Sequence, residues 1–315
     1  MIRTLAAAAL ATTLLVASAS AQALRPENDP RNQAPTVGTG GTLAMDHTIV
    51  QGNSNQGALV SAGTANFQYD TFVSNGTYGV YTNNTGANAT VRNSIVTGHS
   101  YGFYRGSGTL TLSHNDVWSN SSGDYSNTSA GPNSLSTNPL FVSSTNPRPT
   151  SYSPVRKAAS DSGADLGALP YTGDATPFLA GTLHEDTTIS GTVSLVGDLT
   201  VSPGVILTFG PGTTVTAAAT DVMASGANSS RVELIARGTL RVQGSASSPI
   251  TFKGATAGAS RKTGRSAAAG VTSSFCANLT PSATSCAAAS WMCSTISTIW
   301  RRNAVSSAIS MRSRC

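Results

Sequence analysis

Short apolar runs separated by glycine, asparagine and serine repeat along the first half of the chain. Four segments share an apolar anchor flanked by polar residues, and their anchors are Ile49, Phe72, Ile95 and Val117, spaced 23, 23 and 22 residues apart. A second element containing glycine follows each anchor, at 56–59, 78–81, 101–104 and 122–125, and the last three of these also contain tyrosine. A fixed period of roughly 20 to 50 residues is typical of a solenoid.

One repeat contains only short β-prone runs, so it cannot bury a core by itself. Stacked repeats place each short strand beside its equivalent in the next coil, about 4.8 Å away. The sequence therefore predicts a parallel β-solenoid over 40–171, with the four anchors as its inward apolar column. We expect the polar positions two residues before and three after each anchor to be corners, because Asn and Gly tolerate left-handed backbone conformations.

The second half of the chain has a different pattern. Apolar and polar residues alternate over 192–199 and 205–209, and Pro-Gly and Gly-Pro-Gly turns separate the runs. This pattern is typical of strands and turns, and it predicts a second β-rich segment over 172–259. Residues 260–315 lack such periodicity and contain all 4 cysteines. We hypothesise that this tail is out of frame or otherwise non-native; a disulfide-bonded cap and a basic anchoring tail are the alternatives.

Composition and charge narrow the class of protein. Only 10% of residues are charged, against about 25% in an average globular protein, which argues against helical architectures. The formal net charge of +5 comes from the tail, because residues 24–260 contain 11 basic and 14 acidic residues. We therefore expect no nucleic-acid partner. No cysteine lies before the tail, so a disulfide framework is not expected in the main fold.

The N-terminus has the pattern of a secretory signal peptide over 1–23, followed by a linker over 24–39. Arg3 supplies the positive charge, 5–16 the apolar stretch, and Ala21-Gln22-Ala23 a cleavage site. The apolar stretch is shorter than the roughly 20 residues that a membrane span needs. We expect a secreted, extracellular or cell-surface protein, with a periplasmic location as an alternative, and no transmembrane segment after signal cleavage.

These motifs resemble those of a known fold family. The repeat, with its N-x-I or N-x-V corners and its G-V-Y or G-F-Y elements, is similar to the right-handed parallel β-helix repeat of secreted bacterial proteins in the pectate-lyase-like superfamily. Segments 138–142, 153–155 and 165–171 resemble the closing segment of uncharacterised surface members, with Asn138 in place of the usual Asp. Residues 172–259 resemble the start of another β-helix. The resemblance implies an all-β, right-handed parallel β-helix followed by a second β-rich segment.

The resemblance also implies a possible chemistry. Lyases of this superfamily hold calcium with clustered carboxylates and use Arg or Lys as a base. Asp46 and Asp70 lie on successive predicted coils, and Arg92 on the next matches the register of Asp46, so these three are weak catalytic candidates. A solvated face is the alternative interpretation. Histidine and cysteine spacing predicts no metal site, and Ca²⁺ is expected as a cofactor only if the chain is a lyase.

Aromatic residues form the stronger candidate site. Tyr78 with Tyr101, and Tyr81 with Tyr104, take equivalent places on adjacent coils, so we expect stacked pairs on an outer face beside Arg105. Such rings can bind a glycan, or they can stabilise the sheet by cross-strand pairing. The sequence favours a non-catalytic scaffold that binds polysaccharide or a cell-surface glycan. A polysaccharide lyase or glycoside hydrolase, and a truncated fragment without independent function, are the alternatives.

Overall fold

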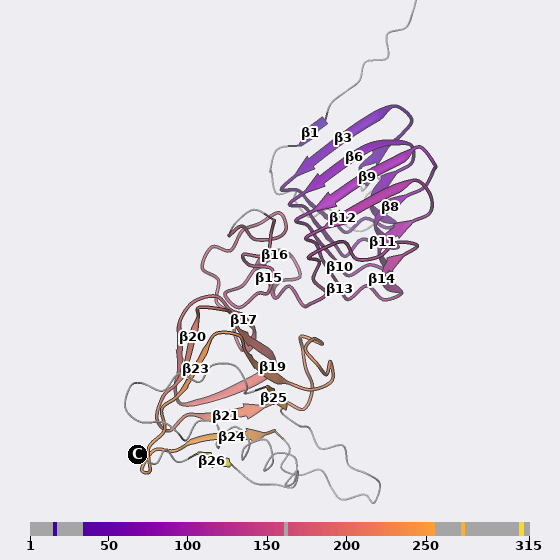
Figure 1. The fold of residues 1–315 in the computed structure, drawn as a ribbon. Coiled ribbons are helices and arrows are strands. Elements are labelled where there is room, and N and C mark those ends of the chain that lie inside the picture. Colours follow the sequence, from indigo (N-terminus) through magenta and orange to yellow (C-terminus); the bar gives the residue numbers. More distant parts are fainter. Residues whose placement is uncertain (1–14, 18–33, 161–162, 256–271, 275–308, 312–315) are drawn as a thin grey trace, which may run out of the picture. The chain divides into compact units, whose positions relative to one another are not determined.

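The computed structural model describes residues 15–17, 34–160, 163–255, 272–274 and 309–311 (Figure 1). The described residues form strands, turns and loops with no helix, which confirms the all-β prediction. Two compact units divide the chain. The first contains 1–136, 143–148 and 157–170, and the second contains 137–142, 149–156 and 171–315.

Three parallel sheets build the first unit, and each coil adds one strand to each sheet. The first sheet contains β1 (Leu15–Ala17), β3 (Gly41–Asp46), β6 (Gly63–Gln68), β9 (Ala87–Arg92) and β12 (Thr109–Ser113). The second contains β4 (Ile49–Gln51), β7 (Thr71–Val73), β10 (Ile95–Thr97) and β13 (Asp116–Trp118). The third contains β2 (Thr36–Val37), β5 (Gln56–Val60), β8 (Tyr78–Thr82), β11 (Tyr101–Arg105) and β14 (Gly123–Ser126). The predicted parallel β-solenoid is therefore confirmed.

The inward column of the second sheet differs from the predicted one. Strand pairing places Val50, Phe72, Val96 and Val117 in one column, and all four belong to the buried core. The prediction was wrong for Ile49 and Ile95, which pair with Thr71 instead. The coils are unequal, because the equivalent residues Asn53, Asn75, His99 and Asn120 are 22, 24 and 21 positions apart. Two adjacent residues on a strand face opposite sides of the sheet. A prediction that assumes a constant period therefore selected Ile49 and Ile95 instead of their neighbours Val50 and Val96 as the inward residues.

The corners also lie one residue from their predicted places in two of the four coils. One column of left-handed residues is His47, Tyr69, Asn93 and His114, with φ of 51°, 53°, 54° and 51°. Another is Gly52, Ser74, Gly98 and Ser119, with φ of 71°, 51°, 79° and 55°. Four residues that follow a left-handed residue are buried: Asp70, Asn75, Asn115 and Asn120. They are therefore interior rungs and not the left-handed corners that the sequence indicated.

The closing segment of the first unit covers the outer face of the second sheet. Leu166 and Ala168 are buried there. The Gly167 amide donates to the Asn93 carbonyl at 2.8 Å, and the Ala168 amide donates to Thr71 Oγ1 at 2.9 Å. A side chain at Gly167 would begin 2.7 Å from Ile95 Cδ1, and its φ is 84°. Ile95 is thus buried beneath this segment rather than inside the solenoid.

The second unit is also built from parallel strands. A seven-stranded sheet has the order β25-β22-β19-β21-β24-β26, with β17 paired to β19, and a smaller sheet has the order β18-β20-β23. Their bounds are β17 (Leu179–Leu183), β18 (Thr187–Ile189), β19 (Thr192–Val201), β20 (Ile206–Phe209), β21 (Thr214–Ala217), β22 (Glu233–Ala236), β23 (Thr239–Val242), β24 (Ile250–Gly254), β25 (Thr272–Ser274) and β26 (Ile309–Met311). All these pairings are parallel except β24 with β26. The predicted second β-rich segment is confirmed.

Three predicted segments fall largely outside the described residues. Of the signal peptide (1–23), only β1 is described, and of the linker (24–39), only 34–39. Of the tail (260–315), β25 and β26 are described. The chain also contains β15 (Phe141–Ser143) and β16 (Asn146–Pro149), which pair with each other. The predictions of export and of a non-native tail stay predictions.

Candidate functional site

The outer face of the third sheet carries the predicted tyrosines because of a glycine on each strand. On β8, both Gly79 and Val80 are buried, so the strand returns to its outer face only at Tyr81. A Cβ atom on Gly79 would lie 2.5 Å from Val96 Cγ1 and 2.6 Å from the Gly102 carbonyl oxygen. Only glycine fits where the backbone passes this close to the core. The Y-G-x-Y pattern therefore places two tyrosines on the same side of one strand.

Tyr78, Tyr81, Tyr101 and Tyr104 form one continuous group, the tyrosine cluster. Strand pairing sets Tyr78 beside Tyr101 and Tyr81 beside Tyr104, as the sequence predicted. The ring of Tyr78 lies 6.1 Å from that of Tyr101, 4.7 Å from Tyr81 and 4.8 Å from Tyr104. Tyr104 lies 5.4 Å from both Tyr81 and Tyr101. All four side chains are partly exposed, whereas Val80 and Phe103 point into the core.

Polar groups adjoin the tyrosine cluster. The Tyr81 hydroxyl donates to Asn83 Oδ1 at 2.8 Å. Arg105 is exposed, and its Nε donates to the Asn127 carbonyl at 2.7 Å. Partial desolvation, and then the neighbouring phenols, raise the pKa of Tyr78, so this ring is neutral near pH 7. The cluster offers apolar ring faces beside hydroxyl and amide groups, and Arg105 follows Tyr104 on the same strand; such ring faces and polar groups suit the C–H and O–H groups of a sugar.

The three catalytic candidates take different environments. Asp46 is exposed, with its Oδ1 2.8 Å from His47 Nδ1. Arg92 shares the Asp46 column as predicted, but Gln68 stands between them and accepts hydrogen bonds from Arg92 at 2.5 and 3.2 Å. Asp70 is 0% exposed. The structure therefore aligns Asp46 with Arg92 and places the Asp70 side chain in the interior.

Asp70 belongs to a ladder of hydrogen bonds between coils. Its Oδ1 accepts from the Thr48 amide at 2.8 Å, and its own amide donates to Ser94 Oγ at 3.0 Å. The Ser94 amide in turn donates to Asn115 Oδ1 at 3.0 Å. Burial, with a smaller contribution from the nearby charge of Asp46, raises the pKa of Asp70 from 3.8 to about 7. This environment explains Asp70 as a structural rung that is protonated below neutral pH.

A second buried ladder runs through Asn53, Asn75, His99 and Asn120. Asn75 Oδ1 accepts from Asn53 Nδ2 at 2.8 Å, and Asn75 Nδ2 lies 3.0 Å from the Val50 carbonyl and 3.1 Å from His99 Nε2. His99 Nδ1 lies 3.0 Å from Asn120 Oδ1. Burial lowers the pKa of His99 to about 4, so its neutral ring can accept at one nitrogen and donate at the other. The sequence pattern marked Asn75 and Asn120 as corners and gave no indication of Asn53 and His99, and it did not reveal that all four are buried.

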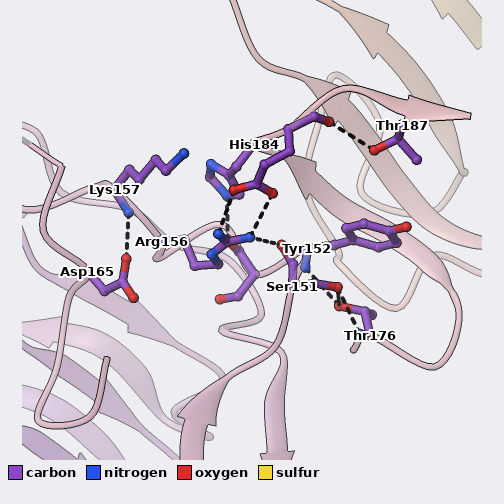
Figure 2. Close-up of polar contacts among 10 residues, drawn as sticks. Ser151, Tyr152, Arg156, Lys157, Asp165, Thr176, His184 and Thr187 are labelled. Atoms are coloured by element: carbon purple, nitrogen blue, oxygen red, sulfur yellow. Dashed lines mark hydrogen bonds and ion pairs between the residues drawn. The ribbon is translucent and has the colours of Figure 1, made fainter. Parts of the chain in front are cut away.

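In the second unit, Arg156 forms an ion pair with Glu185 and hydrogen bonds with neighbouring residues (Figure 2). Its side chain is 6% exposed and donates from Nη2 to Glu185 Oε1 at 2.8 Å. It also donates to the Ser151 carbonyl, and its guanidinium carbon lies 3.8 Å from the centre of the Tyr171 ring. His184 Nε2 lies 2.9 Å from the Ser153 carbonyl. These contacts hold 149–156 against the strands that follow, which is a structural role that the sequence did not reveal.

Three carboxylates organise the loop between β21 and β22. Asp198 accepts from the Glu233 amide at 2.7 Å and from Ser225 Oγ at 3.0 Å. Asp221 accepts from the Met223 and Ser225 amides at 2.9 and 3.1 Å. Burial, and then the charges of Asp221 and Glu233, raise the pKa of Asp198 to about 6. Backbone amides donate hydrogen bonds to these carboxylates, so the three side chains stabilise the conformation of the loop.

Comparisons with protein-family models, with curated proteins and with solved structures find no match for this chain. Within the described ranges, no three or more His, Cys, Asp or Glu side chains are grouped so that they could hold a metal ion. The part of the chain that the structure describes has no helix of the length and apolarity needed to cross a membrane.

Proposed function

We propose that the chain is a secreted or cell-surface β-helix scaffold, similar to the pectate-lyase-like superfamily, that binds a polysaccharide along its tyrosine cluster without cleaving it. The observation that carries the proposal is the group of four partly exposed rings on adjacent strands, with neighbouring ring centres 4.7 to 6.1 Å apart.

The geometry favours an extended ligand. Strands of consecutive coils are about 4.8 Å apart, so a linear glycan that runs along the coil axis passes one Tyr pair and then the next. Each ring gives a face for sugar C–H groups, while Asn83 and Arg105 supply polar contacts at the border. Cross-strand pairing of the rings contributes roughly 0.2–1 kcal/mol to the sheet in either case, so stability alone does not distinguish a binding face from a structural one.

The experiment is calorimetric titration against a panel of neutral and acidic soluble polysaccharides. The Tyr78→Ala/Tyr101→Ala variant should bind at least about tenfold more weakly, which corresponds to about 1.4 kcal/mol. Gln56→Ala is the matched control, because Gln56 occupies the same column one coil earlier, beside Tyr78. Unchanged binding by the double variant, with circular dichroism that matches the wild type, would remove the proposal.

A polysaccharide lyase or glycoside hydrolase is the competing function. Asp70 is better explained as a buried rung, and Arg92 is bound to Gln68. The test is incubation with polyuronates and Ca²⁺, following unsaturated products by their ultraviolet absorbance, with reducing-end release as the readout for hydrolysis. Product formation that Asp46→Asn or Arg92→Ala abolishes would overturn the non-catalytic assignment while leaving the binding face in place.

A further inference from the structure

The outer face of the first sheet carries a regular array of small side chains, all of them polar except Ala44. Strand pairing aligns two columns on β3, β6, β9 and β12. These columns, which we call the hydroxyl array, are Thr42, Thr64, Asn88 and Thr109, and Ala44, Asn66, Thr90 and Thr111. Residues between them, such as Ala65 and Ala89, are buried and fix the array to the core.

The array is periodic in two directions. Figure 1 shows β3, β6, β9 and β12 stacked as parallel arrows in one sheet. Neighbouring strands are about 4.8 Å apart, and side chains two residues apart on one strand are about 6.6 Å apart. All eight positions are uncharged; the charged residues Asp46 and Arg92 belong to the next column, at the end of the strands. The result is a neutral lattice of hydroxyl, amide and methyl groups.

General β-sheet preference for threonine does not explain this distribution. The third sheet, in the same coils, has Gln56, Tyr78, Tyr101 and Gly123 in one outer column and no threonine among them. The second unit contains one comparable column, because its strands β19, β21 and β24 align Thr192, Thr214 and Thr251. Two residues further along, Thr216 pairs with Ser194 and with the charged Lys253, so the second column there is not neutral. A threonine-rich column thus occurs in both units, and within the described residues only the first unit has two neutral columns side by side.

We propose that the hydroxyl array binds ice. The array is a rigid lattice that repeats in two dimensions. A ligand surface that also repeats in two dimensions matches it better than a flexible polymer chain would. The repeat between strands is close to the shorter oxygen spacing on the prism plane of hexagonal ice, and the repeat along each strand is about a tenth shorter than the longer spacing. Each threonine hydroxyl donates one hydrogen bond and accepts two, so it can bond to the waters of an ice surface both as donor and as acceptor, and the methyl groups between the hydroxyls limit competing hydrogen bonds. Charged side chains, which bind ions and disordered water, are absent from its two columns.

The test uses the full fluorescently labelled chain and measures its partition into a slowly growing ice crystal. Thr64→Tyr and Thr90→Tyr put a bulky ring into the middle of the array, while Thr85→Tyr makes the same change in an exposed turn between β8 and β9. Wild type and Thr85→Tyr should be enriched in ice. The two array variants should be rejected, like a serum albumin control, with circular dichroism unchanged.

Three outcomes would overturn the proposal. Rejection of the wild-type chain from ice excludes ice as the ligand. Equal partition of the wild type and the array variants into ice would show that this face does not bind ice. Sedimentation with crystalline cellulose or chitin, lost in Thr90→Tyr and without ice enrichment, would assign the array to a crystalline polysaccharide instead. None of these results depends on the tyrosine cluster, which lies on another sheet and has its own variants.

Discussion

Asp70→Asn is the substitution that separates a structural carboxyl group from a catalytic one. Asp70 is 0% exposed, and its Oδ1 accepts from the Thr48 amide at 2.8 Å. An asparagine can accept the same hydrogen bond without ever carrying a charge. Asn115 already occupies the equivalent place two coils later, where it accepts from the Ser94 amide. The replacement therefore fits the ladder.

The pKa of Asp70 sets the size and the sign of the effect. Burial raises this pKa from 3.8 to about 7, which corresponds to a free energy on the order of 4 kcal/mol. Below pH 3.8 the carboxyl group is protonated in both folded and unfolded chains. Between pH 3.8 and about 7 only the folded chain keeps the proton, so the free energy of unfolding falls as the pH rises. Asp70→Asn removes this loss.

Urea unfolding of wild type and Asp70→Asn at a series of pH values measures the difference directly. The two chains should unfold at similar urea concentrations near pH 4, and the variant should be the more stable by several kcal/mol at pH 8, with about 4 kcal/mol expected. Asp46→Asn is the control, since Asp46 is exposed and should show little change. A variant less stable than wild type at every pH would refute the assignment of a protonated, buried rung.

Three further substitutions test the interior. Asn75→Ala leaves several buried ladder groups without partners and should cost about 3 kcal/mol in urea unfolding, whereas Asn84→Ala, in an exposed turn, should cost little; equal costs would contradict the ladder. Gly79→Ala should lower the melting temperature far more than Gly86→Ala, whose Cβ would meet only a contact at 3.7 Å; similar melting temperatures would exclude the close approach. Asp198→Asn should remove a fall in stability between pH 3.8 and about 6, and an unchanged pH profile would place Asp198 in water.

The strands and the tyrosine face could be predicted because both depend on local pattern. The Y-G-x-Y elements fix their own register, since only glycine fits beside the core, and the pairing of Tyr78 with Tyr101 followed. The register of the second sheet could not be predicted in the same way. Ile49 and Val50 are both suitable core residues, and the choice depends on coil lengths that differ by up to three residues, from 21 to 24.

Long-range contacts explain the remaining differences. Ile95 is covered by Gly167 rather than by its own coil, and the Ala168 amide reaches Thr71, 97 residues earlier. Nothing in the local pattern near Ile95 indicates that cover. Asp70 has an ordinary polar context in the sequence, and only the stacking of coils shows that it is enclosed. The candidate tyrosines were found because they are aligned in the repeat, and the candidate acids failed to assemble because their registers differ.

Hydroxyl-radical footprinting with and without bound polysaccharide tests the central proposal most directly. Mass spectrometry would report oxidation at each tyrosine of the cluster and at Tyr171, which lies against Arg156 in the second unit. We predict that the ligand protects Tyr78, Tyr81, Tyr101 and Tyr104 and leaves Tyr171 unchanged. Protection elsewhere, with the four cluster tyrosines oxidised as in the free chain, would contradict a glycan-binding role for this face.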